Sequence, residues 1–429
     1  MLILHAGLLI DGTGAPPRRN ALLFVEHGKI TDILDAHSVA IPEGAEFVDA
    51  REETLMPGMI DAHVHVMWSG VPADPLASRE GMVCDLPGAF ALHAYANARQ
   101  DLMAGFTALR DMLSYDFVDI SLRNAINQGL VEGPRISACG YGLTATGGHM
   151  DLYNGLRPDV RLGYFNNVVD TPEEARKAVR FLVKMGVDHI KINAGRGYRL
   201  KGRPILFAPE MRPDVLKVIC DEAHTAGRKV AAHSLGSLGE YWAVEAGVDS
   251  LEHAHFIDDA TIDLMAKRGT YLVPTMTHCV RNTLEIRKTL PKEKWPNDLI
   301  LNAYDSMYRV IPKAHKLGVR IATGTDAGAD NVPHGCNAME LELLTTAGMT
   351  TMQAIVAATG TGAEVLDMAD TIGTLEKGKC ADLLVVQGDP LADIRILQNQ
   401  SRISIVFKEG RPVADRRKAA KGEAYVSVV

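Results

Sequence analysis

The chain reads TPEEARKAVRFLVKMGVDHIKINAG at residues 171–195 and RPDVLKVICDEAHTAGRKVAAHSL at residues 212–235. Each segment begins with apolar residues at helical spacing, which predicts an amphipathic helix. A glycine follows that helix, and a short apolar run typical of a buried strand comes next. The repeated unit is therefore a helix, a turn at glycine and a strand.

The same order continues on both sides of these two segments. Further apolar runs are SLEHAHF at 250–256, YLVPTMT at 271–277 and RIATGTD at 320–326. Alternating strands and helices predict parallel βαβ units, and a (β/α)₈ TIM-like barrel is their most economical arrangement. An open doubly wound sheet is the alternative, but it would be expected to carry a GxGxxG turn after an early strand, and the sequence has none.

Short apolar runs separated by turn residues mark both ends of the chain. LILHAGLLI and ALLFVEHGKITDIL stand near the N-terminus, and KCADLLVVQGDP and ISIVFKEGRPV stand near the C-terminus. Neither end offers enough residues for a core of its own, so we expect the two ends to pack together. The predicted α/β architecture is a barrel at residues 56–370 and a small split β-sandwich built from residues 1–55 and 371–429.

Composition excludes several function classes. Lysine and arginine total 45 and aspartate and glutamate total 53, so the formal net charge is -8, which argues against a nucleic-acid binder. No apolar run is long enough for a membrane span, and no secretory signal precedes the first strand. The six cysteines form no CxxC pair, as expected of free thiols in a reducing compartment. We therefore expect a soluble, cytoplasmic protein.

A pair of histidines stands in the segment MPGMIDAHVHV at residues 56–66. His63 and His65 are separated by one residue, so on a strand both side chains point to the same side. Two imidazoles on one side can bind one metal ion. An HxH pair alone is weak evidence, because surface or core histidines also give this pattern.

Further ionisable residues occur on other predicted barrel strands. Lys191 lies in the apolar run HIKIN, where burial would lower the pKa of its amine. A neutral amine can react with carbon dioxide to give a carbamate that could bridge two cations, although a lysine paired with a barrel acid is the alternative. His233, His253 and Asp326 end their strands, at the face where barrel active sites are built.

The order HxH, Lys, His, His, Asp resembles the amidohydrolase superfamily of metal-dependent hydrolases. PGMIDAHVH, GTDAG and IGTLEKGKCADLLVV extend this resemblance over nearly the whole chain. TGGHM at residues 146–150 and HGCNAMELELLTTAG after residue 333 are similar to the branch that holds imidazolonepropionase, prolidase-like Xaa-Arg/Lys or Xaa-Pro carboxypeptidases and ochratoxin-type amidases. The resemblance implies two Zn²⁺ ions per chain, or other divalent metals, with one ion on His63, His65 and Asp326, the other on His233 and His253, and a carboxylated Lys191 bridging them.

The resemblance also implies a mechanism. A hydroxide between the two metals attacks an amide carbonyl, and Asp326 accepts its proton and returns it to the leaving nitrogen. His149, in the TGGHM turn, is expected to donate to the carbonyl oxygen or to position the substrate. The expected substrate is an N-acyl amino acid or a dipeptide. Relatives of this kind imply a homo-oligomer.

Several residues near the predicted strand ends are candidates for substrate binding. Carboxypeptidase members of the branch hold the substrate α-carboxylate with a tyrosine where this chain has Met211, which cannot donate a hydrogen bond. That contact is therefore lost or moved, and arginines after Lys191 could replace it because their forks suit carboxylates. The candidates are Trp68, Arg196, Tyr198, Arg199, Met211, His278 and His334.

Three alternatives stay open. The presence of Met211 in place of the carboxylate-binding tyrosine favours hydrolysis of a small neutral, cyclic or xenobiotic amide, or of a (thio)carbamate. A mononuclear deaminase would need no bridging lysine and would carry an HxE base where His233 is followed by Ser234 and Leu235. A barrel that has lost its activity is disfavoured because no metal position is missing.

Overall fold

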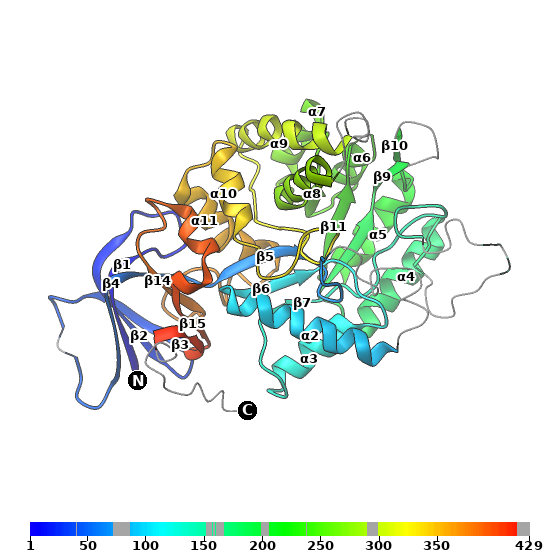
Figure 1. The fold of residues 1–429 in the computed structure, drawn as a ribbon. Coiled ribbons are helices and arrows are strands. Elements are labelled where there is room, and N and C mark those ends of the chain that lie inside the picture. The colour runs from blue at the N-terminus through cyan, green and yellow to red at the C-terminus, as the bar shows by residue number, and fades with distance from the viewer. Residues whose placement is uncertain are drawn as a thin grey trace.

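The structure is a computed structural model that describes residues 1–39, 41–71, 86–151, 157, 159, 167–198, 206–236, 238–289 and 299–417. Figure 1 shows a sheet made by the two ends of the chain, at the left, beside a larger body of strands and helices. None of the described helices is long and apolar enough to cross a membrane.

Strands from both ends of the chain form one seven-stranded sheet, in the order β16-β15-β14-β4-β1-β2-β3. The two ends join where β4 pairs antiparallel with β14, with Met56 opposite Leu384. The expected sandwich is therefore a single mixed sheet in the described residues, and β4 runs past the boundary expected at residue 55. The strands are β1 (Leu2–Leu9), β2 (Arg18–Glu26), β3 (Lys29–Asp35), β4 (Glu46–Pro57), β14 (Leu383–Gln387), β15 (Ile403–Lys408) and β16 (Arg411–Asp415).

The central part of the chain contributes two all-parallel sheets. One has the order β5-β6-β7 and the other the order β13-β12-β11-β8. Their strands are buried on both faces, as expected where helices cover a parallel sheet. The bounds are β5 (Met59–Val64), β6 (Phe106–Asp111), β7 (Arg135–Ser137), β8 (His189–Asn193), β11 (Lys229–Ser234), β12 (Ser250–His253) and β13 (Tyr271–Val273).

Backbone contacts link these two sheets on both sides. Leu143, beyond β7, pairs in parallel with Ile192 of β8. On the other side Ile321 pairs in parallel with Leu272 of β13, and the amide of Ala62 in β5 donates to the carbonyl of Thr323 at 2.9 Å. The segment around Ile321 therefore stands between β13 and β5, where the expected barrel requires an eighth strand. The order of neighbours is consistent with that barrel.

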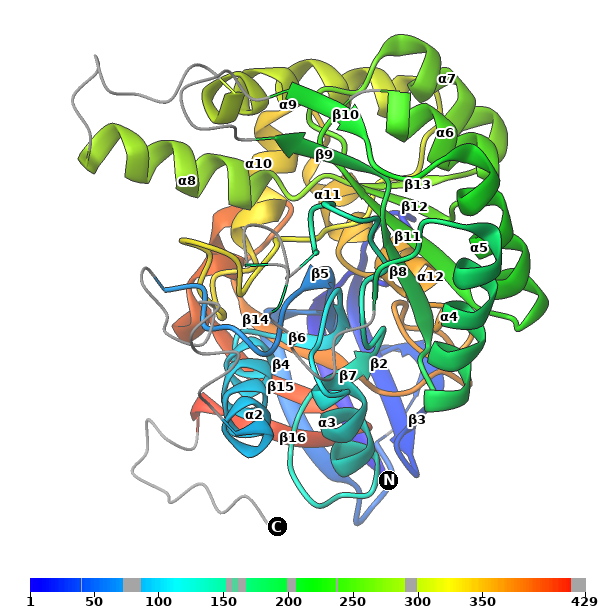
Figure 2. The same cartoon turned by 90° about the vertical axis from the view of Figure 1, so that its right-hand side faces the viewer.

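The predicted helix, glycine and strand units are present. Thr171 and Glu174 form a capping box at the start of α4, and Gly186 ends the helix with φ 89°, just before β8. In Figure 2 the helices α4 to α7 lie outside the strands β8 and β11 to β13. The helices are α2 (Pro87–Met103), α3 (Val118–Asn127), α4 (Pro172–Met185), α5 (Pro213–Thr225), α6 (Leu238–Ala246), α7 (Asp259–Arg268), α8 (Met276–Thr289), α9 (Leu299–Lys316), α10 (Met339–Thr346), α11 (Thr351–Ala357) and α12 (Gly360–Val365).

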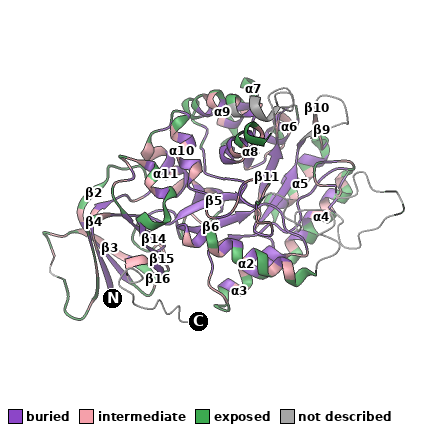
Figure 3. Ribbon diagram, viewed as in Figure 1, coloured by how far each residue is buried: buried purple, intermediate pink, exposed green. Residues whose placement is uncertain are grey.

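A small hairpin departs from this pattern. Its strands β9 (Gly195–Tyr198) and β10 (Leu206–Pro209) pair antiparallel between β8 and α5. Figure 3 shows that the strands of the larger body are buried, whereas many helices present exposed residues outward. Between β14 and β15 the chain forms two 3₁₀ helices, η3 (Ile394–Gln398) and η4 (Gln400–Arg402).

Candidate metal centre

The structure brings all six predicted metal ligands to one cavity. This cavity has a volume of about 250 Å³ and opens at the C-terminal ends of the parallel strands. Its ionisable lining residues are His63, His65, His149, Lys191, His233, His253, His278, Asp326 and Asp330. The separate strand ends therefore converge as the sequence predicts.

Asp326 stands between the pair His63 and His65 and the pair His233 and His253. Its Oδ1 lies 3.1 Å from Nε2 of His65 and 3.5 Å from Nε2 of His63. Its Oδ2 lies 4.0 Å from Nδ1 of His253, whose ring centre is 4.5 Å from that of His233. Ligand atoms of His63, His65 and Asp326 lie within 4.8 Å of one another, a spacing at which one cation could contact all three.

The protonation states of the histidines fit metal binding. Burial lowers the pKa of His63 to about 4, and it lowers the pKa values of His233 and His253 well below the ordinary value. Neutral imidazole is the form that binds a metal ion. In addition, Nε2 of His233 is buried with no hydrogen-bond partner among the described residues. Buried polar atoms normally have partners, so this nitrogen fits a ligand position.

Lys191 also fits its predicted role. Its side chain is 4% exposed and lines the same cavity. Burial lowers the pKa of the amine to about 8, against the opposing effect of the Glu252 and Asp326 carboxylates. A larger share of this amine is therefore neutral near pH 7 than in an exposed lysine, and the neutral form is the one that reacts with carbon dioxide.

The backbone at two of the predicted ligands has an uncommon conformation. His253 has φ 65° and Asp326 has φ 64°, in the left-handed region that residues with a side chain seldom occupy. Such conformations cluster at functional sites. Gly324, two residues before Asp326, allows close packing there, because a Cβ at this position would lie 2.8 Å from Cβ of His63.

A buried carboxylate orients His63. Oε2 of Glu252 lies 2.8 Å from Nδ1 of His63, which leaves Nε2 of that ring directed at Asp326. Oε1 of Glu252 accepts hydrogen bonds from Arg110 at 2.7 Å and from Ser250 at 2.5 Å. Burial alone would raise the pKa of Glu252, but Arg110 and His63 hold it at about 2, so the group is ionised. Carboxylates that hold a ligand histidine in this way raise its basicity and fix its orientation.

We expect Glu252→Gln to weaken metal binding by about 10- to 100-fold, the usual effect of losing such an outer partner. The amide cannot accept from both Arg110 and the His63 ring as the carboxylate does. Competition with a chelator measures the affinity. Glu222→Gln is the matched control, because Glu222 also pairs with arginines, Arg176 and Arg180, but on the outer helices. Equal affinities of the Glu252→Gln variant and the native chain would contradict the orienting role.

The predicted substrate contacts are only partly brought to the cavity. Trp68, His149 and His278 line it, and Nδ1 of His278 lies 3.9 Å from Oδ2 of Asp326. The ring of His149 stacks on that of His233, with centres 4.2 Å apart and an interplanar angle of 14°. Arg196 and Tyr198 lie on β9, but their side chains, like the whole of Arg199, fall outside the described residues.

Two of the predicted substrate contacts are not among the described residues that line the cavity. Met211 is 2% exposed and packs in the main hydrophobic core. His334 is also buried, with Nδ1 at 2.7 Å from Oδ2 of Asp101 and Nε2 at 3.0 Å from the carbonyl of Trp68. Because both ring nitrogens are occupied, His334 holds the loop after β5 and is not placed to contact a substrate.

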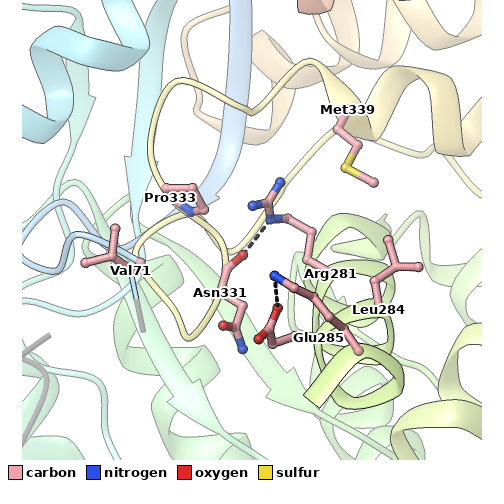
Figure 4. Close-up of a pocket in the computed structure, with 9 residues that line it drawn as sticks. Val71, Arg281, Leu284, Glu285, Asn331, Pro333 and Met339 are labelled. Carbon is pink, nitrogen blue, oxygen red and sulfur yellow. Dashed lines mark hydrogen bonds and ion pairs between the residues drawn. The ribbon is translucent and has the colours of Figure 1, made fainter. Parts of the chain in front are cut away.

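A second cavity of about 280 Å³ is lined by a different set of residues (Figure 4). Its apolar walls come from Val71, Leu284, Pro333 and Met339. Nε of Arg281 donates to the carbonyl of Asn331 at 2.5 Å across it. No predicted metal ligand is among the described residues that line this cavity, so the chemistry belongs to the first one.

Comparison with known proteins identifies the family of this chain. The sequence profile described as "Amidohydrolase family" matches residues 54–413. The chain belongs to the amidohydrolase family. The family resemblance drawn from the sequence is thereby confirmed, and the chain is a member of a family of hydrolases that act on amides.

Similar amidohydrolases include enzymes with different named substrates. Ochratoxinase of Aspergillus niger is 31% identical over 95% of this chain and 86% of its own length. Imidazolonepropionase of Mesorhizobium japonicum is 26% identical over 89% of this chain and 88% of its own length. Among solved structures, a Xaa-Pro dipeptidase with methionine bound in its active site has a TM-score of 0.83 and 32% identity, over 96% of this chain and 99% of that one.

Proposed function

We propose that this amidohydrolase is a binuclear metal-dependent hydrolase that cleaves the amide bond of an N-acyl amino acid or a dipeptide. The observation that carries the proposal is the convergence of six donor side chains in one cavity of about 250 Å³. The similarity to a Xaa-Pro dipeptidase supports a small amide substrate. We also infer that the two parallel sheets and the segment around Ile321 form one (β/α)₈ barrel.

Two divalent cations would be held by the predicted ligands. His63, His65 and Asp326 would hold one ion and His233 and His253 the other, with a carbamate on Lys191 between them. Imidazole and carboxylate donors suit Zn²⁺ in particular. When bound, two such cations polarise the scissile carbonyl and lower the pKa of the attacking water.

The residues of the chain supply the proton transfer and the positioning. Burial alone would raise the pKa of Asp326, but the neighbouring His278 and His63 rings hold it well below its usual range, so the carboxylate is ionised. It can accept the proton of the attacking water and pass it to the leaving nitrogen. His149 lines the cavity next to His233, where its ring can donate to the carbonyl oxygen of the substrate.

A specific observation favours a neutral amide as the second candidate substrate. The cavity lining within the described residues contains Asp330 but no arginine, and its one lysine is Lys191. An α-carboxylate would therefore need a cation from the segment after Lys191. A small neutral amide or (thio)carbamate would need none.

The mononuclear deaminase receives less support. Glu252, the glutamate next to His253, is 0% exposed and is bonded to His63 and Arg110. It is therefore not directed into the cavity, where a base must reach the substrate. A homo-oligomer and a cytoplasmic location stay predictions of the sequence.

The test is a hydrolysis screen of the zinc-loaded protein. N-acyl amino acids and dipeptides are compared with the same compounds carrying a C-terminal amide. We expect the free acids to be preferred in kcat/KM by about 100-fold, which corresponds to about 2.7 kcal/mol in the transition state. Equal or better hydrolysis of the amidated compounds would assign the neutral-amide substrate instead. Absence of hydrolysis in both series would overturn the proposed function.

A further inference from the structure

We propose that Glu210 is a positioning residue for the amide hydrolysis and acts through His149; this inference rests on the proposed function. Glu210 stands between β10 and α5, next to the buried Met211. Its carboxylate is directed at the loop of residues 144–150, which carries His149. The two residues lie far apart in sequence, and no sequence pattern joins them.

The carboxylate of Glu210 binds both ends of this loop. Oε2 accepts a hydrogen bond from the backbone amide of His149 at 2.9 Å. Oε1 accepts from the amide of Ala145 at 3.1 Å and from the hydroxyl of Thr144. One side chain therefore determines where the backbone of His149 stands relative to the start of the loop.

The loop is closed so tightly on Glu210 that a side chain is excluded at Gly148. A Cβ at this position would lie 2.1 Å from Oε1 of Glu210 and 2.3 Å from Oγ1 of Thr144. Contacts of this length do not occur, so any larger residue would displace the carboxylate. The glycine of the TGGHM segment that directly precedes His149 is thus explained by its contact with Glu210.

Glu210 also connects the loop to the strand that carries Lys191. Its backbone amide donates to the carbonyl of Ala194, just beyond β8, at 2.8 Å. The ring of His149 meanwhile stacks on His233, in the neighbouring strand β11. Glu210 therefore fixes the position of His149, proposed to bind the substrate carbonyl, relative to the proposed metal ligands Lys191 and His233. Misplacement of a catalytic group by about 1 Å can cost about 100-fold in rate.

A double-mutant cycle tests whether Glu210 acts through His149. Glu210→Gln keeps the size of the side chain but gives it one acceptor oxygen, so the contacts to Ala145 and His149 cannot both persist. We expect this variant to lower kcat by about 10-fold with KM changed less than about 2-fold, because the effect falls on the transition state. In a His149→Ala background the same change is expected to alter kcat by less than about 2-fold, since interacting residues are not additive.

Hydrogen exchange gives a readout that does not depend on activity or on metal. In the metal-free protein, Glu210→Gln is expected to speed exchange of the amides of residues 144–150 by at least about 10-fold, with little change elsewhere. Asp170→Asn is the matched control. Asp170 binds the amide of Thr146 at 2.9 Å in the same loop but does not bind His149. It is expected to leave kcat within about 2-fold of the native value.

The outcomes separate this inference from the proposed function. A native chain that hydrolyses no amide overturns the function, whatever the exchange shows. An active native chain in which Glu210→Gln lowers kcat equally with and without His149 overturns the positioning role. Unchanged exchange in the loop, or an equal loss of kcat in Asp170→Asn, overturns it as well. Faster exchange together with a non-additive cycle supports it.

Discussion

Asp326→Asn is expected to lower kcat by about 1,000-fold, within the usual effect of removing a general acid–base group. Asparagine matches aspartate in size but cannot take a proton from water at neutral pH. It also removes the negative charge that lies 3.1 Å from His65, so we expect weaker metal binding as well. Steady-state kinetics on the preferred amide, with metal content measured on the same samples, checks both effects.

The matched control for this prediction is Asp188→Asn. Asp188 stands at the opposite end of the parallel strands, just before β8, where it pairs with Arg123 at 2.6 Å. Loss of this half-buried ion pair is expected to lower the stability of the fold and to leave kcat within about 2-fold of the native value. If Asp326→Asn with full metal content kept native kcat, the proton-transfer role of Asp326 would be wrong.

The convergence of the proposed metal ligands could be predicted from the sequence because these residues obey short-range rules. His63 and His65 follow the alternation of a strand, and His233, His253 and Asp326 follow from the rule that barrel sites form at C-terminal strand ends. The helix and strand units followed from apolar spacing and from glycines such as Gly186. These signals lie within a few residues of the positions they predict.

Glu252 shows what such rules miss. Alternation along β12 predicts that Glu252 and His253 point to opposite sides, yet Glu252 bonds to His63 and His253 lines the same cavity as His63. The left-handed backbone of His253 breaks the alternation and makes both orientations possible. The partner Arg110 comes from a strand 142 residues away, and no local pattern predicts that pairing.

The substrate-binding residues were the least predictable part of the site, because contacts between residues far apart in the sequence also decide their orientation. Met211 was predicted as a contact from its alignment with a tyrosine of related carboxypeptidases, and His334 from its place after the last predicted strand, but neither is among the described residues that line the cavity. The ring of His334 is hydrogen-bonded to Asp101 of α2, a residue 233 positions earlier in the chain. An unpaired buried charge is costly, so pairing with the buried carboxylate of Asp101 decides the orientation of the His334 ring, whatever its position relative to the strand ends.

Lys191→Gln is expected to reduce the bound zinc from two ions to at most one per chain and to lower kcat by at least about 1,000-fold, or about 4 kcal/mol. Glutamine cannot form a carbamate, so the group proposed to bridge the two metals is lost. The fold should survive, because the change replaces a buried amine whose charged form is already disfavoured. Elemental analysis after zinc loading and dialysis gives the metal content, and kinetics on the preferred amide gives kcat.

Two controls distinguish loss of the carbamate from a general effect of replacing a lysine: a variant of another lysine, and the addition of bicarbonate. Lys229→Gln changes a lysine at the start of the adjacent strand β11, where its amine lies 3.4 Å from Asp367, and is expected to leave metal content and kcat near native values. Added bicarbonate should speed zinc reactivation of the native metal-free protein but not of the Lys191→Gln variant, since only the former has an amine to carboxylate. Two tightly bound ions and native kcat in Lys191→Gln would make the bridging assignment wrong and leave Lys191 as a lysine paired with the barrel acids Glu252 and Asp326.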